Sequence, residues 1–199
     1  MAYIVAATGN QHKLEEYRQL LDGQNIELKS LLDYPEYPEP EENGSSFKEN
    51  ASIKALSACK YCDVPAFADD SGLEVEALDN RPGIYSSRYA ETDEKRIARI
   101  LEELKGKTNR RARFVCVIAI AVNGEVIETF EGEVKGTILE APRGENGFGY
   151  DPIFQPDGFD KSFAELTQEE KNRISHRANA YAKALEFVED EMSILDDDF

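Results

Sequence analysis

Residues 3–21 have the sequence YIVAATGNQHKLEEYRQLL, and this stretch indicates the fold class. Residues 3–7 are apolar and favour a strand, whereas Thr8-Gly9-Asn10 favours a turn. From residue 11 to residue 21 the apolar side chains recur on one face of a helix, at Leu14, Tyr17, Leu20 and Leu21. A strand, a glycine-containing turn and a helix in that order are typical of the start of an α/β fold.

Further helices and strands follow along the chain. We predict helices over residues 47–62, from a cap at Thr92 to about residue 105, and over residues 175–191, and strands over residues 26–28, 65–68, 73–78, 114–122 and 125–134. Asn123-Gly124 separates the last two strands and is the strongest short hairpin signal. We therefore expect an α/β fold with a mixed twisted sheet flanked by helices.

Loops and helix caps are predicted between these elements. Residues 33–45, 81–89 and 141–161 are predicted loops, and Asp69-Asp70-Ser71-Gly72 is predicted to end the strand over residues 65–68. Capping boxes, in which two side chains bond each other's backbone, are predicted at Ser46/Glu49, Ser162/Glu165 and Thr167/Glu170. In the last helix the residues predicted to face inward are Ala178, Tyr181, Ala182, Leu185 and Val188.

The composition is that of a globular protein with a large excess of acidic residues. Hydrophobic residues make up 41% of the chain, and the formal net charge is −17. We expect no nucleic-acid partner, because such binding depends on Lys and Arg side chains that neutralise phosphates. No apolar run has the length of a membrane helix and the N-terminal segment has no basic leader, so we expect no membrane and a cytoplasmic protein.

The first candidate for chemistry is Thr8-Gly9-Asn10-Gln11-His12-Lys13, where a predicted strand leads into a helix. Backbone N–H groups and the helix dipole favour an anion at such a place, and Lys13 on the first turn can reach the same anion. The segment therefore suggests a phosphate site. The alternative is an ordinary strand–helix turn in which Asn10 caps the helix.

The second candidate is a set of carboxylates. Asp69 and Asp70 follow an apolar strand, and Glu39, Glu41 and Glu42 lie on the preceding loop. Mg²⁺ prefers oxygen ligands, typically one or two carboxylates plus substrate phosphates, and a carboxylate can also deprotonate an attacking water. The alternatives are a turn at the strand end and, for the loop glutamates, solvated charges.

The third candidate is Gly147-Phe148-Gly149-Tyr150-Asp151-Pro152. Two glycines around an aromatic residue allow the backbone to approach a flat ligand closely. We expect Phe148 to stack on a base and Asp151 to accept a hydrogen bond from a ring N–H. The alternative is a rigid loop with buried aromatic side chains.

The fourth candidate is Lys171 with Ser175-His176-Arg177. Donors on His176 and Arg177 that point at a carbonyl oxygen would favour a 6-oxo purine. Adenine carries an amino donor at that position, so buried donors would be left unpaired, which gives strong discrimination. For His176 the alternative is a structural residue at the start of a helix, whose ring makes its hydrogen bonds within the protein.

These motifs occur together in a known order, and the chain resembles the inosine triphosphate pyrophosphatase family, the Ham1/RdgB-like non-canonical purine NTP pyrophosphatases. The matching residues are 7–10 with 13, 41–42 with 47, 49–51 and 54–55, 68–73, 82–86 with 88–89, 147–152 with 154, and 164–166 with 169–171 and 174–177. Each motif alone is weak evidence, but six in order over nearly the whole chain are strong evidence. The differences are Gln11-His12, which occupy variable positions, and the acidic residues after Glu191, which lie outside the matching stretch.

The resemblance implies hydrolysis of ITP, dITP and XTP to the monophosphate and pyrophosphate, which cleanses the nucleotide pool. It also implies Mg²⁺, a homodimer, and an elongated two-lobed structure with a central cleft. We expect residues 1–191 to form this two-lobed domain and residues 192–199 to form an acidic tail.

The family match also implies roles for individual residues. Glu42 and Asp70 would bind the metal, and Asp70 would accept the proton of the attacking water. The substrate-binding residues would be Thr8, Gly9, Asn10 and Lys13 for the triphosphate, Lys54 for a phosphate, Ser71, and Phe148, Gly149, Tyr150, Asp151, Lys171, His176 and Arg177 for the base.

Two alternatives stay open at this point. A related Maf-like pyrophosphatase would act on dTTP or UTP, and a nucleotide-binding regulator would have no turnover. The predicted base pocket argues against the first, and the presence of Lys13, Glu42 and Asp70 argues against the second.

Overall fold

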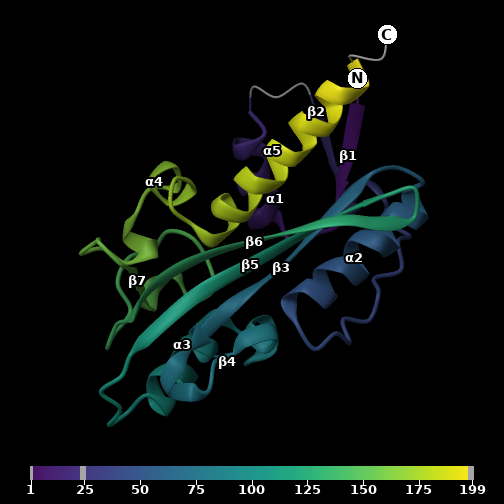
Figure 1. Cartoon of the computed structure of the whole chain (residues 1–199). Helices are drawn as coiled ribbons and strands as arrows, with labels where there is room; N and C mark the ends of the chain where they lie inside the picture. The colour runs from purple at the N-terminus through teal and green to yellow at the C-terminus, as the bar shows by residue number, and fades with distance from the viewer. Residues whose placement is uncertain (1, 23–25, 197–199) are drawn as a thin grey trace. The chain divides into compact units, whose positions relative to one another are not determined.

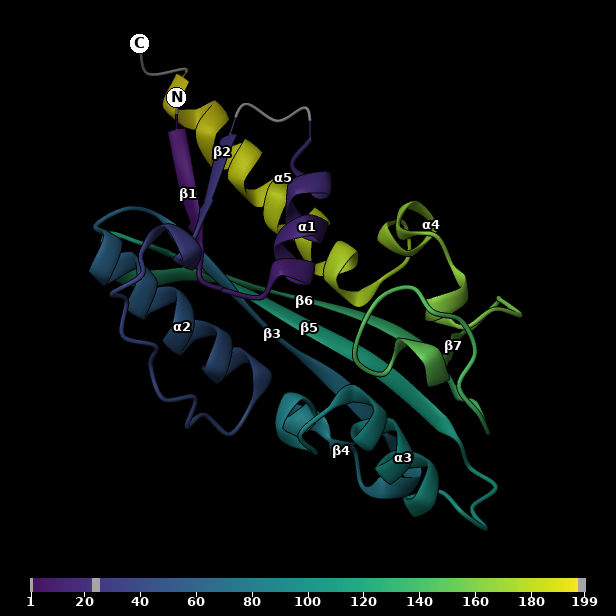
Figure 2. The ribbon, with the colours of Figure 1, turned by 180° about the vertical axis from the view of Figure 1, so that it is seen from behind.

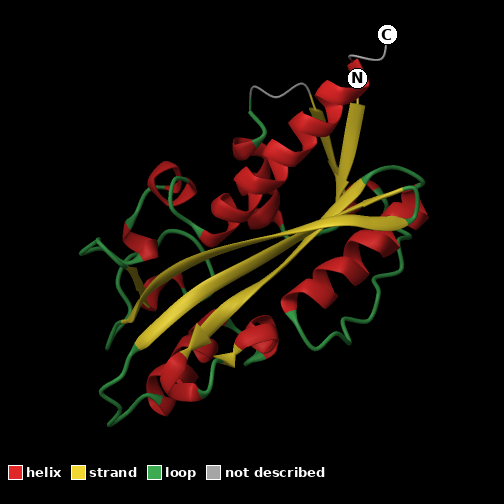
Figure 3. Ribbon diagram, in the orientation of Figure 1, coloured by secondary structure: helices red, strands yellow, loops and turns green. Residues whose placement is uncertain are grey.

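The computed structural model describes residues 2–22 and 26–196, which form a mixed sheet with helices against it (Figures 1 and 3). The strands are β1 (Ala2–Ala6), β2 (Ile26–Ser30), β3 (Ala66–Val75), β4 (Arg81–Pro82), β5 (Arg111–Val122), β6 (Glu125–Ile138) and β7 (Phe154–Pro156). Within the described residues the strand order is β2-β1-β3-β5-β6-β7, and β4 pairs with β3. Strand β1 is parallel to β2 and β3, whereas β6 and β7 are antiparallel, so the predicted mixed α/β sheet is confirmed.

The helices agree closely with the sequence predictions. They are α1 (Gln11–Leu20), α2 (Phe47–Cys62), α3 (Asp93–Glu103), α4 (Gln168–Asn172) and α5 (His176–Asp196). The predicted capping boxes Ser162/Glu165 and Thr167/Glu170 are both present, and Thr92 caps α3 as predicted. Ser46 caps α2 as predicted, but the Glu49 carboxylate binds Ser45 instead of closing the box on Ser46.

The chain divides into two compact units. The first contains Met1–Asp70, Val117–Gly132 and Arg177–Phe199, and the second contains Ser71–Cys116 and Glu133–His176. The two-lobed domain over residues 1–191, its central cleft and the acidic tail stay predictions. Among the described residues, no helix combines the length and the apolar character that crossing a membrane requires.

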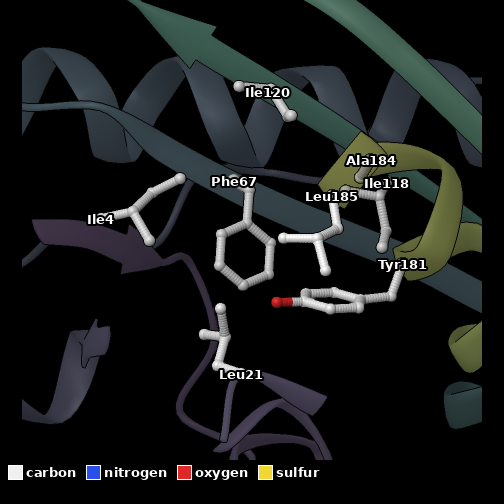
Figure 4. Close-up of a pocket in the computed structure, with 8 residues that line it drawn as sticks. All are labelled: Ile4, Leu21, Phe67, Ile118, Ile120, Tyr181, Ala184 and Leu185. Carbon is white, nitrogen blue, oxygen red and sulfur yellow. The ribbon is translucent and has the colours of Figure 1, made fainter. Parts of the chain in front are cut away.

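The core of the first unit contains buried residues of β1, α1, α2, β3, β5 and α5. Helix α1 lies beside α5 in both views (Figures 1 and 2). The ring of Tyr17 on α1 is fully buried and meets the ring of Phe67 edge-on, with centroids 5.0 Å apart. Figure 4 shows an apolar pocket in this unit, of about 40 Å³, lined by Ile4, Leu21, Phe67, Ile118, Ile120, Tyr181, Ala184 and Leu185. None of the predicted site residues lines it.

The core of the second unit is built around aromatic side chains. Phe114 of β5 packs against Phe154 and Phe163, with ring centroids 4.7 and 5.8 Å away. Leu73 and Ile100 are fully buried in the same cluster. This core supports the segments that carry the second group of predicted site residues.

The largest difference from prediction is β3. We expected two strands, over residues 65–68 and 73–78, separated by a turn at Asp69-Asp70-Ser71-Gly72. Instead β3 runs without a break from Ala66 to Val75, and Glu76–Leu78 form a short 3₁₀ helix. Asp69 and Asp70 are buried there, and both carboxylates have cationic partners. Because β propensity depends on surroundings, these ion pairs override the local turn tendency of the four residues.

Smaller differences occur in two predicted loops and in α5. Residues 81–89 form β4 and a short 3₁₀ helix, and residues 141–161 contain β7 and another short 3₁₀ helix. On α5 the predicted inward face holds for Ala178 and Tyr181, but Ala182 is exposed and Ala180 and Ala184 are buried instead. Leu185 is half-buried, and Val188 lies outside the side chains that are described.

Candidate active site

The turn between β1 and α1 is organised by its own polar side chains. Asn10 Oδ1 accepts the backbone N–H groups of His12 and Lys13 at 3.0 and 3.3 Å. Thr8 Oγ1 accepts the backbone N–H of Asn10 at 3.1 Å. The capping role of Asn10 is therefore present, while Gly9 and Asn10 are exposed to solvent. Phosphate binding at this turn stays a prediction.

Lys13 belongs to a buried network of alternating charges. Its Nζ lies 2.8 Å from Asp69 Oδ2. Arg177 Nε lies 3.7 Å from the same oxygen, and Arg177 also forms an ion pair with Glu16 of α1. Glu16, Asp69 and Arg177 are all buried, with at most 4% exposure. Because buried charges need partners, this network holds Lys13 and Arg177 in fixed positions.

Asp69 is ionised in this network. Burial alone would raise the pKa of its carboxyl, but the charges of Lys13, Arg177 and Lys54 outweigh burial and hold the pKa well below its usual range. A carboxylate that stays ionised far below neutral pH is a poor proton acceptor. Asp69 therefore serves to orient the two cations.

Lys54 joins the two predicted metal ligands. Its Nζ lies 3.1 Å from Glu42 Oε2 and 3.4 Å from Asp70 Oδ1. Burial would lower the pKa of Lys54, but the charges of Asp70, Asp69 and Glu42 raise it above its usual value, so the ammonium is retained. The structure thus brings Glu42, Lys54 and Asp70 together within the first unit.

Asp70 differs from its neighbour Asp69. Burial raises the pKa of Asp70, the charge of Glu42 adds to the rise, and Lys54 opposes it. Its second oxygen, Oδ2, is buried and has no hydrogen-bond partner. A carboxylate with a raised pKa and an available oxygen has the properties of a proton acceptor or of a metal ligand.

The same residues can be tested against the predicted Mg²⁺. Among the side chains that the structure describes, no three of His, Cys, Asp or Glu gather as a closed metal site. Mg²⁺ commonly takes one or two carboxylates and fills its other positions with water and phosphate oxygens. Glu42 and Asp70 both contact Lys54, and Asp70 Oδ2 has no hydrogen-bond partner, so the two carboxylates fit such an open site.

In the second unit, the loop around Phe148 is held by Asp151. The backbone N–H of Phe148 donates to Asp151 Oδ2 at 3.0 Å. Gly147 has a φ of +73°, and a Cβ placed on it would lie 2.1 Å from the same oxygen. Both the backbone conformation and the lack of space therefore require glycine at this position.

Lys171 completes this group. Its Nζ lies 2.7 Å from Asp151 Oδ2, and both side chains are almost fully buried. The same ammonium lies 5.0 Å from the centroid of the Phe148 ring, within the range of a cation–π contact. The structure brings Phe148, Asp151 and Lys171 together, so the predicted base residues form one cluster.

The other predicted residues of the second unit have separate contacts. The ring of His176 is buried and stacks on Phe114, with centroids 4.8 Å apart and planes inclined by 14°. The hydroxyl of Tyr150 donates to the backbone oxygen of Ser86 at 2.7 Å. Ser71 lies half-buried on β3. Their substrate roles stay predictions.

The chain is similar to known proteins over most of its length. A family model described as the Ham1 family matches residues 4–187. The chain belongs to the Ham1 family. In this Ham1 chain, the match includes both groups of candidate residues.

Individual relatives cover most of the chain. A dITP/XTP pyrophosphatase of Deinococcus deserti is 51% identical over 181 residues, which are 90% of this chain and 86% of the relative. A dITP/XTP pyrophosphatase of Bacillus subtilis is 45% identical over 95% of this chain and 98% of its own length. The structure of a HAM1 protein from Coxiella burnetii superimposes with a TM-score of 0.88 at 42% identity, covering 96% of this chain and all of that one.

Sequence reasoning missed two residues that contact the candidate site residues. Glu16 pairs with Arg177, which lies 161 positions away. The one local feature that points to Glu16 is its place on α1: it follows Lys13 by three residues and so lies on the same side of the helix. Asp93 accepts the backbone N–H of Gly149, 56 positions away, and no local pattern marks it.

Proposed function

We propose that this chain hydrolyses the non-canonical purine nucleoside triphosphates ITP, dITP and XTP to the monophosphate and pyrophosphate. The observation that carries the proposal is the pair of carboxylates Glu42 and Asp70, joined by Lys54, in a chain of the Ham1 family. Relatives from Deinococcus deserti and Bacillus subtilis are named dITP/XTP pyrophosphatases. No observation favours a Maf-like enzyme or a regulator without turnover.

The proposed chemistry uses the first unit. The oxygen of a water attacks the α-phosphorus, the bond to the bridging oxygen of the β-phosphate breaks, and Asp70 takes the proton of the water. Lys13 and Lys54 neutralise charge on the phosphates, which is the main task in phosphoryl transfer. We propose that Glu42 and Asp70 hold Mg²⁺, which would further neutralise the phosphate oxygens and stabilise the leaving pyrophosphate.

The turn after β1 contributes to the same part of the substrate. We propose that Thr8, Gly9, Asn10 and Lys13 bind the triphosphate, and that Ser71 adds a further contact. The exposure of Gly9 and Asn10 supports this, since their backbone is open to a ligand. The buried anchor Asp69 keeps Lys13 in position for the task.

The residues proposed to bind the base belong to the second unit, except Arg177, which belongs to the first. We propose that Phe148 stacks on the purine and that Gly149, Tyr150, Asp151, Lys171, His176 and Arg177 surround it. In the described structure Asp151 binds both Lys171 and the N–H of Phe148, so its first task is to hold those two groups. Arg177 is likewise oriented by Glu16.

We further propose a homodimer that acts in the cytoplasm and binds no nucleic acid. The dimer is supported by the family resemblance alone. The net charge of −17 supports the absence of a nucleic-acid partner, since long anions would be repelled. The cytoplasm is supported by the proposed substrates, which belong to the nucleotide pool.

The deciding experiment measures pyrophosphate release from ITP, dITP, XTP, ATP, GTP, dTTP and UTP, with Mg²⁺ and with EDTA. The proposal expects metal-dependent turnover of ITP, dITP and XTP, and little turnover of the others. Preference for dTTP or UTP would support the Maf-like alternative. Absence of turnover with every nucleotide would refute the enzymatic proposal.

A further inference from the structure

A carboxylate outside the predicted site contacts the middle of the Phe148 loop. Asp93, the first residue of α3, accepts the backbone N–H of Gly149 through Oδ2 at 2.8 Å. Its other oxygen binds Arg96 one turn later in the same helix. Gly149 lies between Phe148 and Tyr150, so the bond restrains the backbone at the centre of the proposed base-binding loop.

The three successive residues Phe148, Gly149 and Tyr150 are each held by a hydrogen bond, and Asp93 accepts the bond from Gly149. The N–H of Phe148 is held by Asp151, and the hydroxyl of Tyr150 is held by Ser86. Gly149 has no side chain, and a Cβ built there would meet nothing within 4 Å. Packing therefore does little to fix Gly149, and the hydrogen bond to Asp93 is the restraint that the structure provides.

We propose that Asp93 is a positioning residue for base recognition. By holding the Gly149 N–H, it keeps the ring of Phe148 in place for stacking on the purine. The inference rests on the proposed pyrophosphatase function. The contacts of Asp93 are to Gly149 and Arg96, and it is not among the residues proposed to bind the phosphates. Its loss should therefore act on nucleotide affinity and selectivity and leave the chemical step in place.

A purely structural role must be separated from this one, because an acidic residue in the first turn also favours a helix through the dipole. Asp93→Ala removes both the acceptor and the charge. Asp93→Asn keeps an oxygen that accepts the Gly149 N–H but loses the ion pair with Arg96. Glu94→Ala is the matched control, since Glu94 is exposed, lies in the same turn and bonds within the helix start.

Steady-state pyrophosphate release from dITP and dATP is measured for the full chain and these variants. We expect Asp93→Ala to raise the KM for dITP about tenfold with kcat within about threefold, and to lower the preference for dITP over dATP, as loss of a charge-assisted hydrogen bond predicts. Asp93→Asn should stay within about threefold of the unmodified chain, and Glu94→Ala should be unchanged.

Hydrogen–deuterium exchange of the Gly149 amide provides a readout that needs no turnover. It should be faster in Asp93→Ala and near normal in Asp93→Asn. If the unmodified chain hydrolyses no dITP, the proposed function fails, while the exchange rates still report on the restraint. Unchanged KM and exchange in Asp93→Ala would overturn the inference.

An equal defect in Asp93→Asn and Asp93→Ala would also overturn it, because it would assign the effect to the ion pair with Arg96. If Asp93→Ala does not fold, Asp93→Glu replaces it. The longer side chain keeps the charge and displaces the acceptor, so its KM should exceed that of Asp93→Asn. The reverse order would reject the positioning role.

Discussion

Asp70 is buried, has a cationic partner in Lys54 and has one oxygen without a hydrogen bond. We predict that Asp70→Asn lowers kcat for ITP at least about a hundredfold, because an amide cannot accept the proton of the attacking water. The fold should persist. A raised pKa means that the ionised form is less favourable in the folded chain than in the unfolded one, so a neutral isostere should not destabilise the protein.

Pyrophosphate release and urea unfolding of the Asp70→Asn variant check both parts of this prediction. Glu41→Gln provides a control, since Glu41 is an exposed loop carboxylate next to the proposed ligand Glu42. Full activity of Asp70→Asn would assign the proton acceptor to another group.

Glu16 is the buried partner of Arg177. We predict that Glu16→Gln lowers the free energy of unfolding by about 3 kcal/mol, because it removes one charge of a buried pair and leaves the other poorly compensated. Asp69 still lies 3.7 Å from Arg177, which limits the loss. Denaturant unfolding measures the effect, with the exposed neighbour change Glu15→Gln as control. A loss below about 1 kcal/mol would show that Asp69 alone suffices for Arg177.

At the scale of elements, the loop around Phe148 depends on two glycines that differ in their surroundings. Gly147 and Gly149 both have positive φ, but only a Cβ on Gly147 would collide with the Asp151 carboxylate. We predict that Gly147→Ala raises the KM for ITP more than Gly149→Ala does, because it displaces the group that holds Phe148 and Lys171. Steady-state kinetics of the two variants measures this difference. Equal effects would mean that backbone strain alone matters.

The elements that could be predicted from sequence are those with a strong local signal. Helix α2 matches its prediction from residue 47 to residue 62, because Ser46 caps it and the following residues favour a helix. The continuity of β3 through residues 69–72 could not be predicted, since the four residues Asp-Asp-Ser-Gly favour a turn in isolation. What keeps them extended is tertiary: Lys13 and Lys54 pair with the two carboxylates.

At the scale of the whole molecule, the candidate site could be predicted as a set of motifs but not as a set of contacts. The motifs are local, so resemblance identified Lys13, Asp70 and Lys171 by position. The residues that orient them come from distant parts of the chain, as Glu16 does for Arg177 and Asp93 does for Gly149. The local sequence around Glu16 and Asp93 does not identify these distant partners.

The overall charge of −17 also has a consequence for the molecule as a whole. Repulsion among like charges destabilises the compact state, and salt screens exposed charges much more than buried pairs such as Glu16–Arg177. We predict that raising KCl from about 20 to about 300 mM, in EDTA, raises the melting temperature. Screening worth about 1 kcal/mol corresponds to about 2–4 °C for a chain of this size.

A variant with fewer acidic side chains separates this repulsion from other effects of salt. Glu15, Glu36 and Glu125 are exposed, and changing all three to Gln removes three negative charges. This variant should melt at a higher temperature than the unmodified chain at low salt and should gain less from added KCl, because it has less repulsion left to screen. If the melting temperature of the unmodified chain instead falls with KCl, favourable surface ion pairs such as Arg111–Asp157 contribute more to stability than the repulsion among excess negative charges takes away. That result would contradict the prediction.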